Sequence, residues 1–230
     1  AWFLDEGPPA EEGAAPPAPE PSAAAEPAPA AQPAPAASEP DDPFEAECRN
    51  FVARTLETIQ RQAGQKPAPA VEGTPEEALA LLRETVQTCN LCALHTGRTQ
   101  TVFGAGDPRA EVLFFGEAPG RDEDLQGEPF VGRAGQLLNA MLAAIGFQRD
   151  QVYIANILKC RPPNNRDPKP EEAEACDSWL RQQIELIQPG VILALGRIAA
   201  HKLLNTDQSL GALRGKQYNY AGIPLIVSYH

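Results

Sequence analysis

The chain has 230 residues, a formal net charge of −12, 24 prolines and five cysteines. Its length allows one domain with a sizeable core plus additional chain. No apolar run of about 18 residues is present, which argues against a membrane-spanning helix, and the opening AWFL is too short for the core of a signal peptide.

The negative charge is concentrated near the start of the chain. Residues 1–88 contain 16 acidic and 5 basic residues, hence a net charge of −11. Residues 89–230 contain 15 acidic and 14 basic residues, hence a net charge of −1. The acidity of the whole chain therefore says little about the partner of its folded part, and nucleic acid is not excluded.

Residues 1–73 are predicted to form a disordered arm rich in Ala, Pro and Glu. Half of the prolines fall within the first 43 residues, and residues 5–43 lack large apolar groups to bury. Within the arm, the spacing of apolar residues over 44–62 predicts a short helix. The arm is interpreted as a solvated tether with no specific partner, and docking of the hydrophobic AWFL at residues 1–4 to an unidentified protein partner is the alternative.

A folded domain is predicted over residues 74–230. Thr74 and Pro75, followed by two glutamates, form a helix start that continues to Cys89. Strand-like runs then alternate with helical stretches: strands at 112–116, 152–157, 191–196 and 223–228, helices at about 133–146, 170–187 and 197–205. This alternation predicts an α/β fold, a three-layer α/β/α sandwich with a central four-stranded, mostly parallel sheet. Ligands of such sheets bind at the carboxyl ends of the strands.

The cysteines suggest a metal centre. Cys89 and Cys92 form a C-x2-C pair, and Cys160 and Cys176 supply two more thiols. Four thiolates can hold zinc or an iron–sulfur cluster, and unligated buried thiols are the remaining alternative. Cys48 lies outside the pattern and is interpreted as a free thiol. An odd cysteine count without a secretory signal favours a reducing compartment, the cytoplasm, over a disulfide framework.

Several ordered motifs resemble the family 4 uracil-DNA glycosylases, iron–sulfur enzymes of base-excision repair. The resemblance covers about residues 79–230. The motifs that carry it are GEAPG at 116–120 with ED at 123–124, GEPFVGRAG at 127–135, IANILKCRPPNNRDP at 154–168, EEAEAC at 171–176, LALG at 193–196 and SYH at 228–230. The proline that follows the histidine in the family, and the closing helix, are absent, so we expect the chain to be truncated there.

The resemblance implies a [4Fe–4S] cluster with a structural role on Cys89, Cys92, Cys160 and Cys176. The loop around Cys160 is basic and is predicted to contact backbone phosphates of DNA. Its basic residues are Lys159, Arg161, Arg166 and Lys169.

The resemblance also implies a site for a flipped uracil. Phe130 would stack on the base. Asn156 would read uracil, since one amide can pair with both its N3–H and its O4. His230 would stabilise the uracil anion, and Glu117 would position water or stabilise the sugar cation. Backbone N–H groups around Gly116 and Ala118 would bind the uracil carbonyls. Glu123 or Asp124 is a further candidate for the site.

The predicted function is therefore that of a monofunctional, monomeric uracil-DNA glycosylase that leaves an abasic site. A related group that traps DNA covalently carries Gln where Ala118 stands and a histidine in the loop at 159–170, and this chain has neither. A DNA-binding module without chemistry is a further alternative. A nucleotide-binding fold is weakly supported, because the G-x-G-x-x-G and GxxxxGK[ST] patterns are absent.

Overall fold

The structure, a computed structural model, describes residues 73–230 of the chain. The predicted arm and its helix at 44–62 lie outside these residues, and the domain boundary at residue 74 stays a prediction. No helix of the described part is long and apolar enough to cross a membrane.

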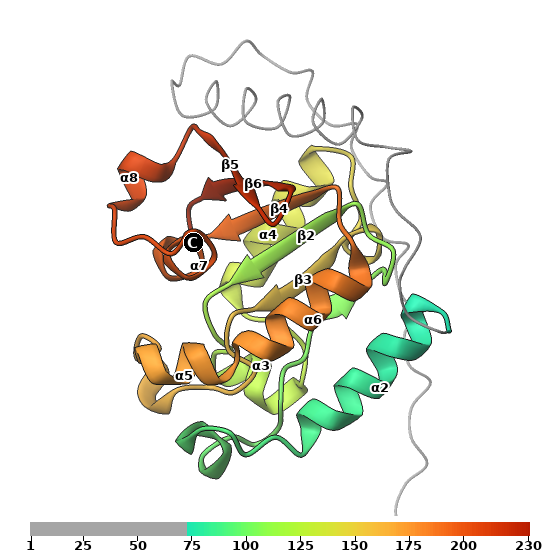
Figure 1. Cartoon of the computed structure of the whole chain (residues 1–230), viewed down its shortest axis with the longest axis vertical. Coiled ribbons are helices and arrows are strands. Elements are labelled where there is room, and N and C mark those ends of the chain that lie inside the picture. The colour runs from blue at the N-terminus through green and yellow to red at the C-terminus, as the bar shows by residue number, and fades with distance from the viewer. Residues whose placement is uncertain (1–72) are drawn as a thin grey trace, which may run out of the picture. The chain divides into compact units, whose positions relative to one another are not determined.

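A six-stranded sheet forms the centre of the described residues (Figure 1). In chain order the strands are β1 Ala105–Gly106, β2 Val112–Gly116, β3 Tyr153–Asn156, β4 Val191–Leu195, β5 Gln217–Tyr220 and β6 Ile223–Ser228. Their order across the sheet is β1-β3-β2-β4-β6-β5. The four inner strands are parallel, and β1 and β5 pair antiparallel at the two edges.

Helices and short 3₁₀ turns connect the strands. The α-helices are α2 Pro75–Gln87, α3 Arg121–Gln126, α4 Arg133–Ala144, α5 Pro170–Ala175, α6 Asp177–Ile187, α7 Arg197–Leu204 and α8 Leu210–Leu213. The 3₁₀ turns are η1 Ala93–Thr96, η2 Arg149–Gln151 and η3 Pro163–Asn165. Thr74 begins α2 with a capping box, in which its hydroxyl accepts from the Glu77 N–H while the Glu77 carboxylate accepts from the Thr74 N–H.

Side chains on alternate positions of the parallel strands face opposite sides of the sheet, and both sides are covered. Leu113 and Phe115 of β2 pack in a cluster with α2, α6 and α7. Val112 and Phe114 pack on the other face with Leu138 of α4. In Figure 1, α6 lies in front of the sheet with α2 beside it, and α4 lies behind the sheet. Burial on both faces explains why the strands read as continuous apolar runs.

The predicted α/β class and its four parallel strands are confirmed. The sheet has six strands where four were predicted, and the short helix α8 was also not predicted. The edge strands β1 and β5 are short or half-exposed and carry no continuous apolar run. The stretch predicted as one helix over 170–187 is two helices, since α5 ends and α6 begins at Cys176.

The strand order places a topological switch point between β2 and β4. The chain passes from β2 to β3 on one side and then crosses to β4 on the other. Connections therefore leave the carboxyl ends of β2 and β4 in opposite directions, which opens a crevice at this edge of the sheet. The predicted site residues Glu117, Asn156 and His230 all lie at carboxyl ends of strands.

Candidate active site and candidate metal centre

A cavity of about 220 Å³ lies at the carboxyl edge of the sheet. It is several times the volume that one water molecule occupies in the liquid, about 30 Å³. It brings together seven of the residues singled out in the sequence, from separate segments of the chain: Glu117, Ala118, Glu123, Phe130, Asn156, Arg166 and His230. Gly116 does not line the cavity but lies directly behind it, as described below.

Glu117 follows β2 directly and is half-buried. Its carbonyl accepts the Leu158 N–H, which ties the start of this turn to the segment after β3. Burial raises the pKa of the Glu117 carboxyl above its ordinary value; the charge of His230 and that of Arg197 oppose the rise, and Asp167 adds to it. A carboxylate with an elevated pKa in a cavity is suited to proton transfer or to stabilising a nearby positive charge.

Phe130 packs tightly against Gly116. A Cβ added to Gly116 would lie 2.5 Å from the Phe130 ring and 2.5 Å from Oδ1 of Asn156. Glycine is therefore required at position 116, because any side chain would displace the aromatic ring or the amide. Phe130 itself has a left-handed backbone with φ +52°, and the residue is 9% exposed.

Asn156 ends β3 and is buried, at 2% exposure. It lies opposite Gly116 in the parallel register of β2 and β3. Its backbone carbonyl accepts from Nζ of Lys159 at 2.8 Å. The side chain is thus held at the floor of the cavity by a buried strand, with little freedom to move away.

His230 reaches the cavity from the end of β6. The N–H of Gly196 donates to the Ser228 carbonyl, which joins the ends of β4 and β6. Gly196 has φ +90°, and a Cβ there would lie 2.6 Å from Cβ of His230. The close approach of the imidazole to the chain after β4 therefore depends on glycine at position 196.

The cavity also contains residues that sequence reasoning did not select. They are Pro119, Gly120, Ala134, Pro162 and Asn165. Asn165 has φ +53°, and its side-chain oxygen accepts from Nε of Arg161 at 2.7 Å. The PPNNR sequence contained the signal for it, since an Asn-Asn pair after two prolines is typical of a turn with left-handed residues. Of the two acidic candidates, Glu123 lines the cavity and Asp124 does not.

The predicted phosphate contact through Lys159 is wrong. Lys159 is 1% exposed, and its Nζ donates to the Asn156 carbonyl and to Oε1 of Gln183. Burial lowers the pKa of Lys159 to about 7. Its side chain points into the protein and braces the segment after β3. Of the other basic residues in this loop, Arg166 pairs with the Glu172 carboxylate at 2.6 Å, while its side chain stays about one-third exposed.

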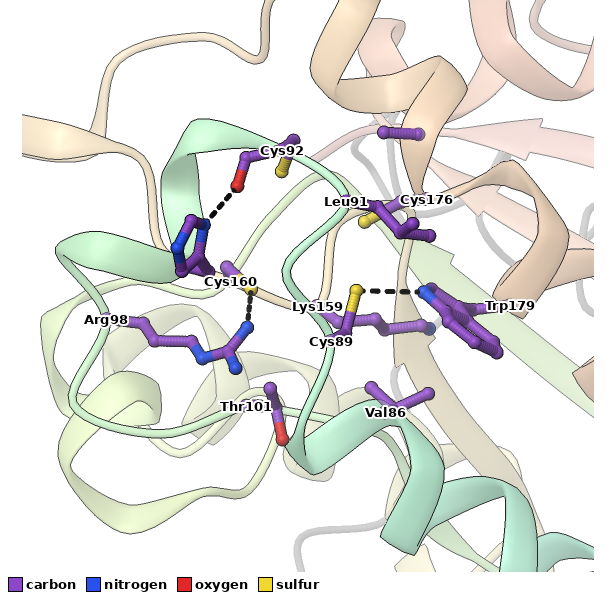
Figure 2. A pocket seen from close by; sticks show the side chains of 12 residues that line it. Val86, Cys89, Leu91, Cys92, Arg98, Thr101, Lys159, Cys160, Cys176 and Trp179 are labelled. Carbon is purple, nitrogen blue, oxygen red and sulfur yellow. Dashed lines mark hydrogen bonds between the residues drawn. The ribbon is translucent and has the colours of Figure 1, made fainter.

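The four cysteines of the predicted metal centre surround a second cavity (Figure 2). Cys89 and Cys92 come from the end of α2 and the turn after it, Cys160 from the loop after β3, and Cys176 from the junction of α5 and α6. In Figure 2 the four sulfurs point toward one shared space. None of the four is in a disulfide. Cys48 lies outside the described residues.

Two side chains donate hydrogen bonds to these sulfurs. Nη1 of Arg98 lies 3.2 Å from Sγ of Cys160, and Nε1 of Trp179 lies 3.4 Å from Sγ of Cys89. Burial raises the pKa of the Cys160 thiol and raises that of Cys176 to about 11. Thiolates at these positions therefore need a compensating positive charge, which a bound metal supplies.

The spacing of the sulfurs bears on which group they could hold. Among the described residues, no set of three or more His, Cys, Asp or Glu side chains is placed to hold a single metal ion. A zinc ion requires four sulfurs at about 2.3 Å from one point.

The model of the Uracil DNA glycosylase superfamily matches residues 103–230. The chain is similar to the type-4 uracil-DNA glycosylase of Archaeoglobus fulgidus, with 48% identity over 162 residues, 67% of this chain and 81% of that protein. It is 45% identical to the type-4 uracil-DNA glycosylase of Thermotoga maritima over 65% of this chain and 78% of that protein. The type-5 uracil-DNA glycosylase of Thermus thermophilus is more distant, at 37% identity over 56% of this chain and 68% of that protein.

Proposed function

Because the chain belongs to the uracil DNA glycosylase superfamily and closely resembles type-4 members, we infer that it hydrolyses the N-glycosidic bond of uracil in DNA. It is a DNA-repair enzyme, and DNA is its substrate. The observation that carries the mechanism is the single cavity in which a carboxylate, an aromatic ring, an amide and an imidazole meet. We further propose that it acts as a monofunctional enzyme and as a monomer. We also propose a cytoplasmic location, because the four described cysteines form no disulfide.

The position of the cavity suits base flipping. A glycosylase cannot reach the glycosidic bond inside stacked duplex DNA, so it rotates the nucleotide into a pocket. The flipped base loses its stacking partners, and the ring of Phe130 offers a replacement. Phe130 packs against Gly116 and beside the Asn156 amide, so a base stacked on this ring would have its edge near Asn156.

Asn156 is proposed to select uracil over cytosine. Uracil presents an N3–H donor and an O4 acceptor, and one amide carries the matching acceptor and donor. Cytosine presents the opposite pair at these positions, so both groups of an amide held in the orientation that reads uracil would be mispaired. Each buried polar group left without a partner costs about 1–3 kcal/mol.

Bond cleavage moves an electron pair from the glycosidic bond into the uracil ring and leaves positive charge on the sugar. His230 is proposed to donate to uracil O2 and stabilise the anion as it forms. Water then adds to C1′ of the sugar and loses a proton, which yields the abasic site. Glu117 is proposed to orient that water, accept its proton and stabilise the cation.

We propose that Cys89, Cys92, Cys160 and Cys176 hold a [4Fe–4S] cluster with a structural role. A bound cluster would supply the positive charge that buried thiolates need, and would join three segments that are distant in sequence. One of them, the loop after β3, carries Pro162, Asn165 and Arg166 of the active-site cavity. The cluster would therefore help to fix part of the cavity wall without taking part in bond cleavage.

The proposed function is tested with oligonucleotides that contain one uracil, opposite G, opposite A or in a single strand. We expect the whole chain to release free uracil and to leave an alkali-sensitive abasic site, while an oligonucleotide with thymine at the same position stays intact. Failure to release uracil from every substrate, by protein that carries its cluster, would contradict the proposal. Strand cleavage without alkali would contradict monofunctional action.

The pH dependence of excision tests the role of Glu117. The reactive form is the carboxylate, and burial raises the pKa of Glu117 above its ordinary 4.5. As pH falls, excision activity should therefore decline. The midpoint of this decline should lie at a higher pH than it would for a glutamate with an ordinary pKa. Glu117→Gln should lower kcat by about 100-fold and remove this acidic limb from the profile of kcat/KM. Glu185→Gln, at an exposed acid on α6, is the control and should keep the parental kcat and the acidic limb of the profile. An unchanged acidic limb in Glu117→Gln would rule out this role.

A further inference from the structure

The carboxylate of Glu123 joins the two turns that build the active-site cavity. Its Oε2 accepts the Gly120 N–H at 3.1 Å, in the turn that follows Glu117. Its Oε1 accepts the N–H of Val131 at 2.9 Å and of Gly132 at 3.0 Å, in the turn that carries Phe130. One side chain therefore holds both turns through three backbone N–H groups.

These three N–H groups lie at the starts of α3 and α4, where the helix itself offers them no acceptor. Gly120 is the N-cap of α3, and Gly132 is the N-cap of α4. The first N–H groups of a helix need an external acceptor, and negative charge is favourable at a helix N-terminus. A carboxylate can serve all three N–H groups, and hydrogen bonds to a charged acceptor are stronger than those between neutral groups.

Phe130 needs such support because its backbone is in an unfavourable region. Its φ of +52° is left-handed, which a residue with a Cβ adopts only when its surroundings impose it. Glu123 holds Val131, the residue after Phe130, through its N–H. Nη2 of Arg149 donates to the carbonyl of Pro129, the residue before Phe130. A Cβ at Gly135 would lie 1.8 Å from the Phe130 carbonyl oxygen, so α4 also approaches this turn closely.

Glu123 is anchored in turn by a firmly held helix. Its neighbour in α3, Asp124, is 3% exposed and accepts the Thr99 N–H at 2.9 Å. Thr99 follows Arg98, which bonds to Cys160 at the metal centre. The position of the Glu123 carboxylate is therefore fixed relative to the core, so it can impose a conformation on the Phe130 turn.

We propose that Glu123 is a positioning residue for base recognition, which acts through Phe130. Its carboxylate holds the aromatic ring at the stacking position over the flipped base, and it takes no part in water activation or in stabilising the anion. This inference rests on the proposed function, because it assigns Phe130 to the stacking of uracil.

The test uses the whole chain with Glu123→Gln, Glu123→Asp and a matched control, Asp122→Asn, an exposed acid in the same turn. Glutamine has one acceptor oxygen and presents an NH₂ donor to one of the N–H groups. Glu123→Gln should lower kcat/KM for uracil excision about 10- to 100-fold, as expected for a misplaced binding group. Glu123→Asp, whose carboxylate is charged but too short, should fall between Glu123→Gln and the parent chain, and Asp122→Asn should match the parent.

Two further readouts separate positioning from a general loss of structure. Inhibition by free uracil should weaken in Glu123→Gln to the same degree as in Phe130→Leu, while affinity for undamaged DNA stays unchanged. In a double-mutant cycle, Glu123→Gln added to Phe130→Leu should reduce excision less than about twofold further, because both act through the same ring. Additive losses, or unchanged inhibition by uracil, would overturn the inference. If the parent chain and Asp122→Asn release no uracil, the proposed function itself fails.

Discussion

Replacing Asn156 with alanine is expected to lower kcat/KM for uracil excision by about 100- to 1,000-fold. The amide is proposed to make two hydrogen bonds to uracil in a buried cavity, each worth about 1.5–2 kcal/mol when the alternative is an unpaired group. A loss of 1.4 kcal/mol corresponds to a factor of ten in rate. The loss should exceed that of a surface variant because Asn156 is only 2% exposed, so water cannot easily replace the missing amide.

The measurement is single-turnover excision from a U·G duplex, with thermal unfolding and visible absorption as controls for folding. The backbone carbonyl of Asn156, which accepts from Lys159, is still present in the alanine variant. The brace after β3 should therefore survive, and the midpoint of thermal unfolding should change little. Excision by Asn156→Ala at the parental rate would refute the proposal that this amide reads the base.

The parallel core of the fold could be predicted because each buried strand leaves a recognisable pattern in its own short stretch of sequence. Strands buried on both faces, such as β2 and β4, have no polar positions and stand out as short apolar runs. The edge strand β5, with sequence QYNY, alternates between exposed and half-buried positions and depends on pairing with β6. Such a strand is defined by its partner, which local sequence does not contain.

Residues of the candidate site could be selected from the sequence where a residue type implies a chemistry, and less so where tertiary packing determines a residue's contacts. Asn156 stands out as an amide inside an apolar strand. The burial of Lys159 could not be inferred, because in sequence it belongs to a basic loop and only the fold places Gln183 beside its Nζ. Glu123 was one of several acids after GEAPG, and its distinction from Asp122 arises from its contacts with Val131 and Gly132, eight and nine residues later.

Loss of one cysteine of the proposed cluster site is expected to have the largest effect on stability. Cys160→Ser should yield a protein that lacks the visible absorption of an iron–sulfur cluster and unfolds at a midpoint lower by about 10–20 °C. Binding of a structural metal group contributes directly to folding free energy. A loss of roughly 5 kcal/mol corresponds to a shift of this size in a domain of about 150 residues.

The position of Cys160 makes excision sensitive to the same substitution. Cys160 is 3% exposed and lies between Asn156 and the cavity residues Pro162 and Asn165. Release of this loop should therefore lower uracil excision along with stability. Cys48→Ser is the matched control, since Cys48 lies outside the four-cysteine set, and it should keep colour, unfolding midpoint and activity. Removal of iron from the parent chain by oxidation and chelation should reproduce the Cys160→Ser result. A colourless, zinc-loaded parent protein after anaerobic preparation would contradict the iron–sulfur assignment.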